Sequence, residues 1–215
     1  MISTAWRFIF LHAPKTGGNS MQLLLQPHSD DRLVSKGWRD GTHRFGVRGP
    51  VTPGKHATLQ HYADGLNGDL DAWRVALTAR DPIERAVSHY FSPHRWTEPD
   101  GAGGWRLKTP TWDLQAFLST LGELTPLTRF VTVDGVVRRP HHLIRHERLA
   151  DDFAAFVRAV GVPVDPSALP WVNRSAAKPG VREAAMADPE VQTAVRSNFA
   201  ADYDMLEAFG ADRAG

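Results

Sequence analysis

Apolar residues recur at two spacings near the start of the chain, and each spacing indicates a different element. Residues 8–11 are an unbroken apolar run of strand length, and an apolar stripe with helical spacing resumes within residues 21–25. A proline and two adjacent glycines lie between them, within residues 14–18. The pattern predicts a strand, a tight loop and a helix.

A second unit of the same kind follows at residues 75–91. Residues 75–79 form an apolar run suited to a buried strand, and Pro82 stands where the first turn of a helix accepts proline. Asp81 is then the predicted N-cap of a helix from Pro82 to about Phe91. Because each strand leads directly into a helix, we expect a mainly parallel sheet with both loops at the carboxyl ends of its strands.

Three further stretches have helical spacing. Residues 54–66 predict a short helix that ends at Gly65, and residues 111–122 predict an amphipathic helix capped by Thr111. Residues 188–210 predict one terminal amphipathic helix. These helices supply apolar faces that can cover the sheet.

The intervening stretches are polar and rich in Gly and Pro. Residues 26–55 have no sustained period and predict loop with short elements, and residues 92–110 predict a long loop with two tryptophans. A loop of that length suits a lid over a binding site. Residues 129–147 predict a hairpin over Asp134-Gly135 followed by a strand.

The composition limits the fold and the functional class. With 215 residues, 42% of them hydrophobic, we expect one α/β domain spanning residues 1–215, a three-layer sandwich with a central mainly parallel sheet. A formal net charge of +1 gives no indication of nucleic-acid binding, and the absence of cysteine excludes a thiol nucleophile. No apolar run is long enough for a membrane span and no leader precedes the first strand, so we expect a cytoplasmic location.

The first loop carries the residues of an anion site. A strand, loop and helix in this order aim unpaired N–H groups and the positive end of the helix dipole at one point. Lys15 adds a full charge, Thr16 and Ser20 add hydroxyl groups, and Gly17-Gly18 lets a phosphate approach the backbone. Ser20 or Asn19 is the predicted N-cap. In the Walker loop of ATP- and GTP-binding proteins the lysine follows the second glycine, whereas here it precedes both glycines.

Two stretches carry a resemblance to a known family. HAPKTGGNS, residues 12–20, resembles the 5'-phosphosulfate-binding loop of the sulfotransferases, in particular the branch of the Golgi carbohydrate sulfotransferases and their bacterial relatives. RDPIERAVSHYF, residues 80–91, resembles the 3'-phosphate-binding motif of the same family. The family usually has Thr or Ser in place of Asn19. The resemblance runs from about residue 7 to residue 210, and only these two motifs make it specific.

The resemblance implies a phosphosulfate site and a transfer reaction. Its donor would be 3'-phosphoadenosine-5'-phosphosulfate, the acceptor a hydroxyl or amine of a carbohydrate or small metabolite, and no metal would take part. Lys15 and residues 16–20 would hold the 5' end of the donor, and Arg80 with Ser88 the 3'-phosphate. Related enzymes close a late basic loop over the nucleotide, which makes Arg174 and Lys178 further candidates.

A histidine between the two motifs is the candidate base. The family has a Gly-His pair at about this distance, whereas this chain reads Gly54-Lys55-His56. A neutral imidazole can take a hydroxyl proton near neutral pH, so His56 is predicted to activate the acceptor and His61 is the second choice. The histidines within residues 141–146 lack a known ligand spacing, so we predict no metal site.

Two other functional classes stay open. A nucleotide-dependent kinase or hydrolase would need a magnesium-binding carboxylate placed after a strand, and we identify none. A non-catalytic nucleotide-binding protein would keep Lys15, Arg80 and Ser88 but would tolerate the loss of His56. The arginines within residues 129–148 indicate a solvated face, an acidic acceptor or a contact with the adenosine end of the donor.

Overall fold

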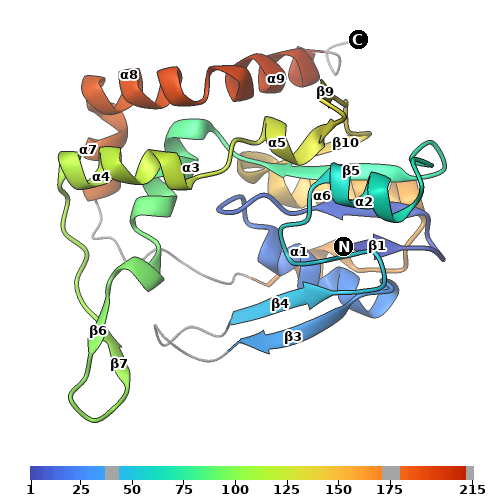
Figure 1. The fold of residues 1–215 in the computed structure, drawn as a ribbon, viewed down its shortest axis with the longest axis horizontal. Helices are drawn as coiled ribbons and strands as arrows, with labels where there is room; N and C mark the ends of the chain where they lie inside the picture. The colour runs from blue at the N-terminus through green and yellow to red at the C-terminus, as the bar shows by residue number, and fades with distance from the viewer. Residues whose placement is uncertain (37–43, 171–179, 212–215) are drawn as a thin grey trace.

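A small mainly parallel sheet forms the centre of this mixed α/β protein (Figure 1), whose computed structural model describes residues 1–36, 44–170 and 180–211. In the described part of the chain the sheet has the strand order β1-β2-β5-β10. These strands are Ile2–Ser3, Phe8–Leu11, Arg74–Ala79 and His142–Arg145. β5 pairs in parallel with β2 and with β10, whereas β1 is antiparallel to β2. The mainly parallel sheet predicted from the sequence is therefore confirmed.

The register of the sheet aligns the carboxyl ends of neighbouring strands. Leu11 at the end of β2 pairs with Leu77, two residues before the end of β5. Residues 12–17, which follow β2, and Arg80, which follows β5, therefore leave the sheet at the same edge. Such an edge is where open α/β sheets place their ligands.

Each face of the sheet buries its own apolar core. Alternate strand residues point to opposite faces, so Ile9 and Leu11 enter one core while Phe8 and Phe10 enter the other. The first core is covered by α2 (Leu59–Gly65), α5 (Thr128–Val131) and α9 (Ala200–Ala211). The second is covered by α1 (Gly18–Leu25) and α6 (Leu149–Val160). Figure 1 shows these helices on either side of the sheet.

A third core lies beyond the carboxyl end of β5. It joins α3 (Pro82–Tyr90), α4 (Leu114–Thr120), α7 (Val181–Ala187) and α8 (Pro189–Asn198), which Figure 1 draws side by side at the left. Tyr90 packs at its centre, with its ring 5.5 Å from Trp96 and 5.3 Å from Trp112. This core fixes α3, the helix of the second predicted motif, against the C-terminal helices.

Short hairpins and 3₁₀ turns complete the structure. The antiparallel pairs are β3 (Arg32–Lys36) with β4 (Arg44–Arg48), β6 (Thr97–Pro99) with β7 (Trp105–Leu107), and β8 (Thr132–Val133) with β9 (Val136–Val137). The 3₁₀ turns are Gln26–His28, Pro93–Arg95, Leu121–Glu123, His146–Arg148 and Pro166–Ala168. In the described ranges, no helix is both long and apolar enough to cross a bilayer.

Two predicted caps are wrong. The N-cap of α1 is Gly17 rather than Asn19 or Ser20, because Gly17 takes the left-handed conformation that turns the chain into the helix. The N-cap of α4 is Asp113 rather than Thr111, because the Asp113 carboxylate accepts a hydrogen bond from the backbone N–H of Ala116. The predicted cap of α3 is confirmed, since the Asp81 carboxylate accepts from the N–H of Glu84.

Two predicted segments are divided differently. The single terminal helix over residues 188–210 is two helices, α8 and α9, because Phe199 turns into the third core between them. The stretch 92–110 is not a plain loop, because β6 and β7 pair in a hairpin that projects from the body in Figure 1. Trp105 on β7 is 49% exposed, whereas Trp96 packs in the third core.

Candidate functional site

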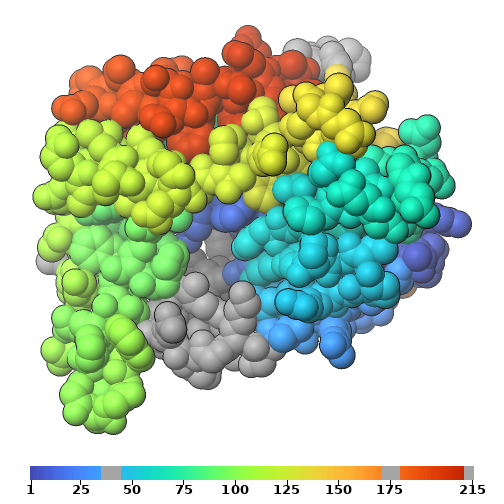
Figure 2. All heavy atoms as spheres, viewed as in Figure 1, coloured from blue at the N-terminus to red at the C-terminus, as the bar shows by residue number. Residues whose placement is uncertain are grey.

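The β2–α1 loop (residues 12–17) leads the chain from the end of β2 into the first turn of α1. Lys15 and Gly17 have φ values of 71° and 85°, both in the left-handed region. The first turn of α1 receives no side-chain cap from the described residues. The N–H groups of this turn and the positive end of the helix dipole therefore face the loop, which is the arrangement expected of the predicted anion site. In Figure 2 the molecule is hollowed between the green and cyan residues, and blue atoms of the N-terminal region form part of the floor.

Gly17, the last loop residue, and Gly18, the first residue of α1, lie close to neighbouring side chains. A Cβ atom on Gly18 would lie 2.2 Å from Cδ2 of His12, which no side chain can tolerate without a shift. A Cβ atom on Gly17 would lie 3.0 Å from Leu149 and 3.4 Å from the ring of His146. The loop therefore needs glycine at both positions, because their backbone lies in direct contact with neighbouring side chains.

The hydroxyl of Thr16 faces the interior. Its side chain is fully buried, and Oγ1 lies 2.7 Å from the carbonyl oxygen of Ala13 and 2.6 Å from Oγ1 of Thr78 on β5. These contacts tie the loop to the neighbouring strand, so Thr16 faces the candidate anion with its backbone. Asn19 is half-buried and Ser20 is buried in the first turn of α1.

Lys15 connects the loop to the end of α3. Its ammonium donates a 3.0 Å hydrogen bond to Oγ of Ser92, two residues beyond α3. Burial lowers the pKa of His89 to about 4, together with the nearby positive charges of Arg95 and Lys15. The cation expected at the 5'-phosphosulfate end of the donor is therefore held between the loop and the second motif. Neither Ser92 nor His89 was predicted, because Ser92 follows the second motif and the resemblance assigns no role to His89 within it.

The second motif places Arg80 at the sheet edge. The Arg80 side chain is 11% exposed, and its Nε donates a 3.0 Å hydrogen bond to the carboxylate of Glu84 one turn later. Ser88 is half-buried on α3. Arg80 thus approaches the site with part of its guanidinium engaged by an exposed carboxylate.

Two residues that the sequence analysis missed surround Arg80. The ring of His146 contacts the Gly17 side of the loop, and its pKa is lowered by burial and then by the charge of Arg80. Arg182 on α7 lies near enough to Arg80 for the two charges to interact, which adds to burial in lowering the Arg182 pKa. Its Nε is buried and has no hydrogen-bond acceptor among the residues that the structure describes. Arg80, Arg182 and the ring of His146 therefore lie together at this edge of the sheet, and Arg182 offers a buried donor that no described residue uses.

His56 lies against the stem of the loop. Its Nδ1 is 2.8 Å from the carbonyl oxygen of His12. Because a carbonyl oxygen only accepts hydrogen bonds, Nδ1 carries the proton in this contact. In the neutral ring Nε2 then holds the lone pair, which is the state that a general base needs. The structure thus places the His56 ring against the backbone of His12, the first residue of the loop that contains Lys15.

The second-choice base, His61, has a structural role. Its Nδ1 accepts a 3.1 Å hydrogen bond from the N–H of Thr58, and the Thr58 hydroxyl caps the same turn. This reciprocal pair starts α2 as a capping box. His61 is therefore used at the helix end, and the geometry favours His56 as the base.

Buried Arg85 holds the β2–α1 loop through a hydrogen bond to its backbone. Its side chain is 1% exposed, its Nε donates to the carbonyl oxygen of Pro14 at 2.9 Å, and its Nη2 donates to that of Thr125 at 2.8 Å. Burial lowers the Arg85 pKa to about 10, and the Asp202 carboxylate, 3.8 Å away, offsets part of this effect. Its place on the inner, apolar face of α3 is the one sequence signal that could have identified this residue.

Two of the predicted cofactor-binding residues cannot be placed. Arg174 and Lys178 lie outside the described residues. Within the described ranges, no group of three or more His, Asp or Glu side chains is arranged to hold a metal ion. Comparison with protein-family models, with curated proteins and with solved structures finds no match.

Proposed function

We propose that the protein is a sulfotransferase that moves a sulfuryl group from 3'-phosphoadenosine-5'-phosphosulfate to a hydroxyl or amine of a carbohydrate or small metabolite. The observation that carries this proposal is the hydrogen bond from His56 to His12, which holds a candidate base beside the glycine loop and Lys15. The helices on both faces of the sheet support the three-layer arrangement that the resemblance implies.

The donor would lie across the carboxyl ends of β2 and β5. The N–H groups of the β2–α1 loop and Lys15 would hold its 5' end. Arg80, Ser88 and Arg182 would hold the 3'-phosphate, because a guanidinium forms forked, charge-assisted hydrogen bonds to phosphate. The buried Nε of Arg182 supplies a donor that no described residue uses.

The reaction would be an in-line displacement at sulfur. The acceptor oxygen forms a bond to sulfur while its proton passes to Nε2 of His56, and the bond from sulfur to the 5'-phosphate oxygen breaks. The leaving oxygen gains negative charge, which Lys15 and the loop N–H groups would stabilise. The products are the sulfated acceptor and adenosine 3',5'-bisphosphate.

Calorimetry tests the donor site directly. Adenosine 3',5'-bisphosphate should bind far more tightly than ADP, because ADP lacks the 3'-phosphate that Arg80 and Ser88 would hold. Equal affinities, or tighter binding of ADP that depends on magnesium, would overturn the proposal. The second result would favour a kinase or hydrolase. Tight bisphosphate binding without sulfuryl transfer to any acceptor of a broad panel would instead indicate a non-catalytic nucleotide-binding protein.

A further inference from the structure

A pocket of about 440 Å³ opens in the segment that connects α4 to β8. Gly122, Thr125, Thr128, Arg129 and Thr132 are among the residues that line it. Its volume lies within the range of small-molecule sites, about 300–1,000 Å³. The pocket has room for a compact metabolite or a single sugar.

Arg85 ties one wall of this pocket to the β2–α1 loop. The same guanidinium reaches the carbonyl oxygen of Thr125 in the pocket lining and that of Pro14, the residue before Lys15. Because Arg85 is buried and also lies beside Asp202, this bridge has a fixed length. The guanidinium of Arg85 therefore connects the pocket lining directly to the loop that would bind the donor.

The segment that lines the pocket also contacts the helix that follows His56. Gln60 on α2 donates to the carboxylate of Asp134, and its amide oxygen accepts from the backbone N–H of the same residue. Asp134 comes two residues after Thr132 of the pocket lining. Ala57, next to His56, shares the first core with Leu127 of the same segment. The segment that lines the pocket is thus held to the donor loop through Arg85 and to α2, the helix after His56, through Gln60.

The lining favours an anionic, hydroxylated ligand. Among the described residues no Asp or Glu lines the pocket, and none forms an ion pair with the exposed Arg129. The hydroxyls of Thr128 and Thr132 donate to Asp202 and to the carbonyl of Thr128, which leaves their oxygens able to accept from a ligand. A guanidinium without a protein carboxylate matches a ligand carboxylate.

The geometry points to this pocket as the acceptor site, and to a small hydroxylated carboxylate as the acceptor, with Arg129 binding its carboxylate. The inference rests on the proposed function. In the reaction a hydroxyl of this acceptor would gain the sulfuryl group and lose its proton to His56, while the carboxylate would stay unchanged and fix the orientation. Arg129 would be a specificity-determining residue that takes no part in bond breaking.

A panel of matched acceptors tests the inference. Radiolabelled phosphosulfate donor is supplied with pairs that differ in a carboxylate, such as glucuronate with glucose and lactate with propane-1,2-diol. We expect a kcat/KM preference of about 10- to 100-fold for the carboxylates, the worth of a hydrogen bond to a charged group. Transfer to the neutral partners at equal or higher rates, or to none of the carboxylates, would overturn the inference.

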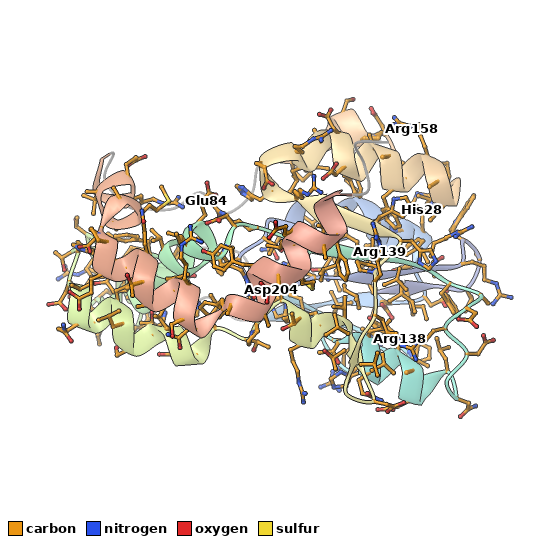
Figure 3. All side chains as sticks on the ribbon, turned by 90° about the horizontal axis from the view of Figure 1, so that it is seen from above. His28, Glu84, Arg138, Arg139, Arg158 and Asp204 are labelled. Atoms are coloured by element: carbon orange, nitrogen blue, oxygen red, sulfur yellow. The ribbon has the colours of Figure 1, made fainter. Side chains whose placement is uncertain are left out.

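Variants separate the pocket from the donor site. Arg129→Ala should remove most of the preference, whereas Arg138→Ala should keep it, because Arg138 (labelled in Figure 3) is exposed beyond the β8–β9 hairpin and does not line the pocket. Gly122→Leu should slow transfer by filling the pocket, since a Cβ there meets no heavy atom within 4 Å and the fold should tolerate it.

The bisphosphate calorimetry distinguishes the two possible failures. If adenosine 3',5'-bisphosphate does not bind, the proposed function fails. If it binds equally to wild type, Arg129→Ala and Gly122→Leu, and neither variant changes transfer to carboxylates, the donor site stands and the acceptor assignment is wrong.

Discussion

Gly18 is constrained by the ring of His12, which occupies the space that a side chain would need. His12 is buried and its Nδ1 lies 2.9 Å from the Gln22 amide oxygen, so the ring has little room to retreat. We expect Gly18→Ala to lower the free energy of unfolding by about 1–3 kcal/mol, the usual cost of overpacking. Urea denaturation measures this. Gly122→Ala is the matched control, because its Cβ would meet no heavy atom within 4 Å. Equal midpoints for the two variants would contradict the prediction.

His56 and His61 are close in sequence and have different predicted effects. His56→Ala should lower turnover by about 10²–10⁴-fold, the usual contribution of a general base, with bisphosphate affinity almost unchanged. His61→Ala should keep turnover and lose about 0.5–2 kcal/mol of stability, because it removes half of a capping box.

Wild-type turnover should also fall at acid pH as the imidazole protonates, and His56→Ala should lose that dependence. Steady-state kinetics over pH distinguish the two histidines, and near-normal turnover of His56→Ala would show that the base lies elsewhere.

At the scale of elements, the β5–α3 connection, which carries Arg80, and α7, which carries Arg182, are predicted to cooperate in binding the 3'-phosphate. Arg80→Ala and Arg182→Ala should each weaken adenosine 3',5'-bisphosphate by roughly 2–3 kcal/mol, about the worth of a charged hydrogen bond, while ADP binding changes little. Calorimetry with both ligands measures the difference. Arg106→Ala is the control, because Arg106 lies on the projecting β6–β7 hairpin and pairs only with the exposed Glu98 among the described residues. An equal loss of ADP affinity would show that the arginines act on the common part of the nucleotide.

Elements with local signals were predicted well. The strand β2, the strand β5 with the Asp81 cap of α3, and the turn at Asp134-Gly135 each follow from residues within a short window. The parallel pairing of β2 with β5 then brings the two predicted motifs to one edge of the sheet.

Elements that depend on distant contacts were not predictable. The break between α8 and α9 lets the Asp202 carboxylate accept hydrogen bonds from the N–H groups of Leu127 and Thr128, which start α5. Nothing near Asp202 in the sequence marks it as a cap for a helix about 75 residues earlier. Arg182 and His146 likewise reach the site only through the fold. Because no local signal marks the break between α8 and α9, the sequence predicted one long helix over residues 188–210.

For the whole molecule, the buried His12 and the partly buried His89 should make stability depend on pH. Burial, with the charges of His56 and Lys55, lowers the His12 pKa well below its ordinary value of 6.5. Burial, with the charges of Arg95 and Lys15, lowers the His89 pKa to about 4. Arg95 also donates a 2.8 Å hydrogen bond to Nε2 of His89, which protonation of that nitrogen would remove.

The sign of the effect follows from where protons bind. In the unfolded chain both histidines take up protons as the pH falls through about 6.5, whereas the folded protein resists protonation until a lower pH. Acid therefore favours the unfolded state, so stability is fully present above pH 6.5 and falls as the pH drops from there toward 4. Urea denaturation at a series of pH values should show this decline. His89→Gln, which keeps a hydrogen-bond acceptor for Arg95 but cannot titrate in this range, should show a shallower decline from pH 6.5 to 4.5. An unchanged slope in His89→Gln would mean that His89 binds its proton equally in the folded and unfolded states.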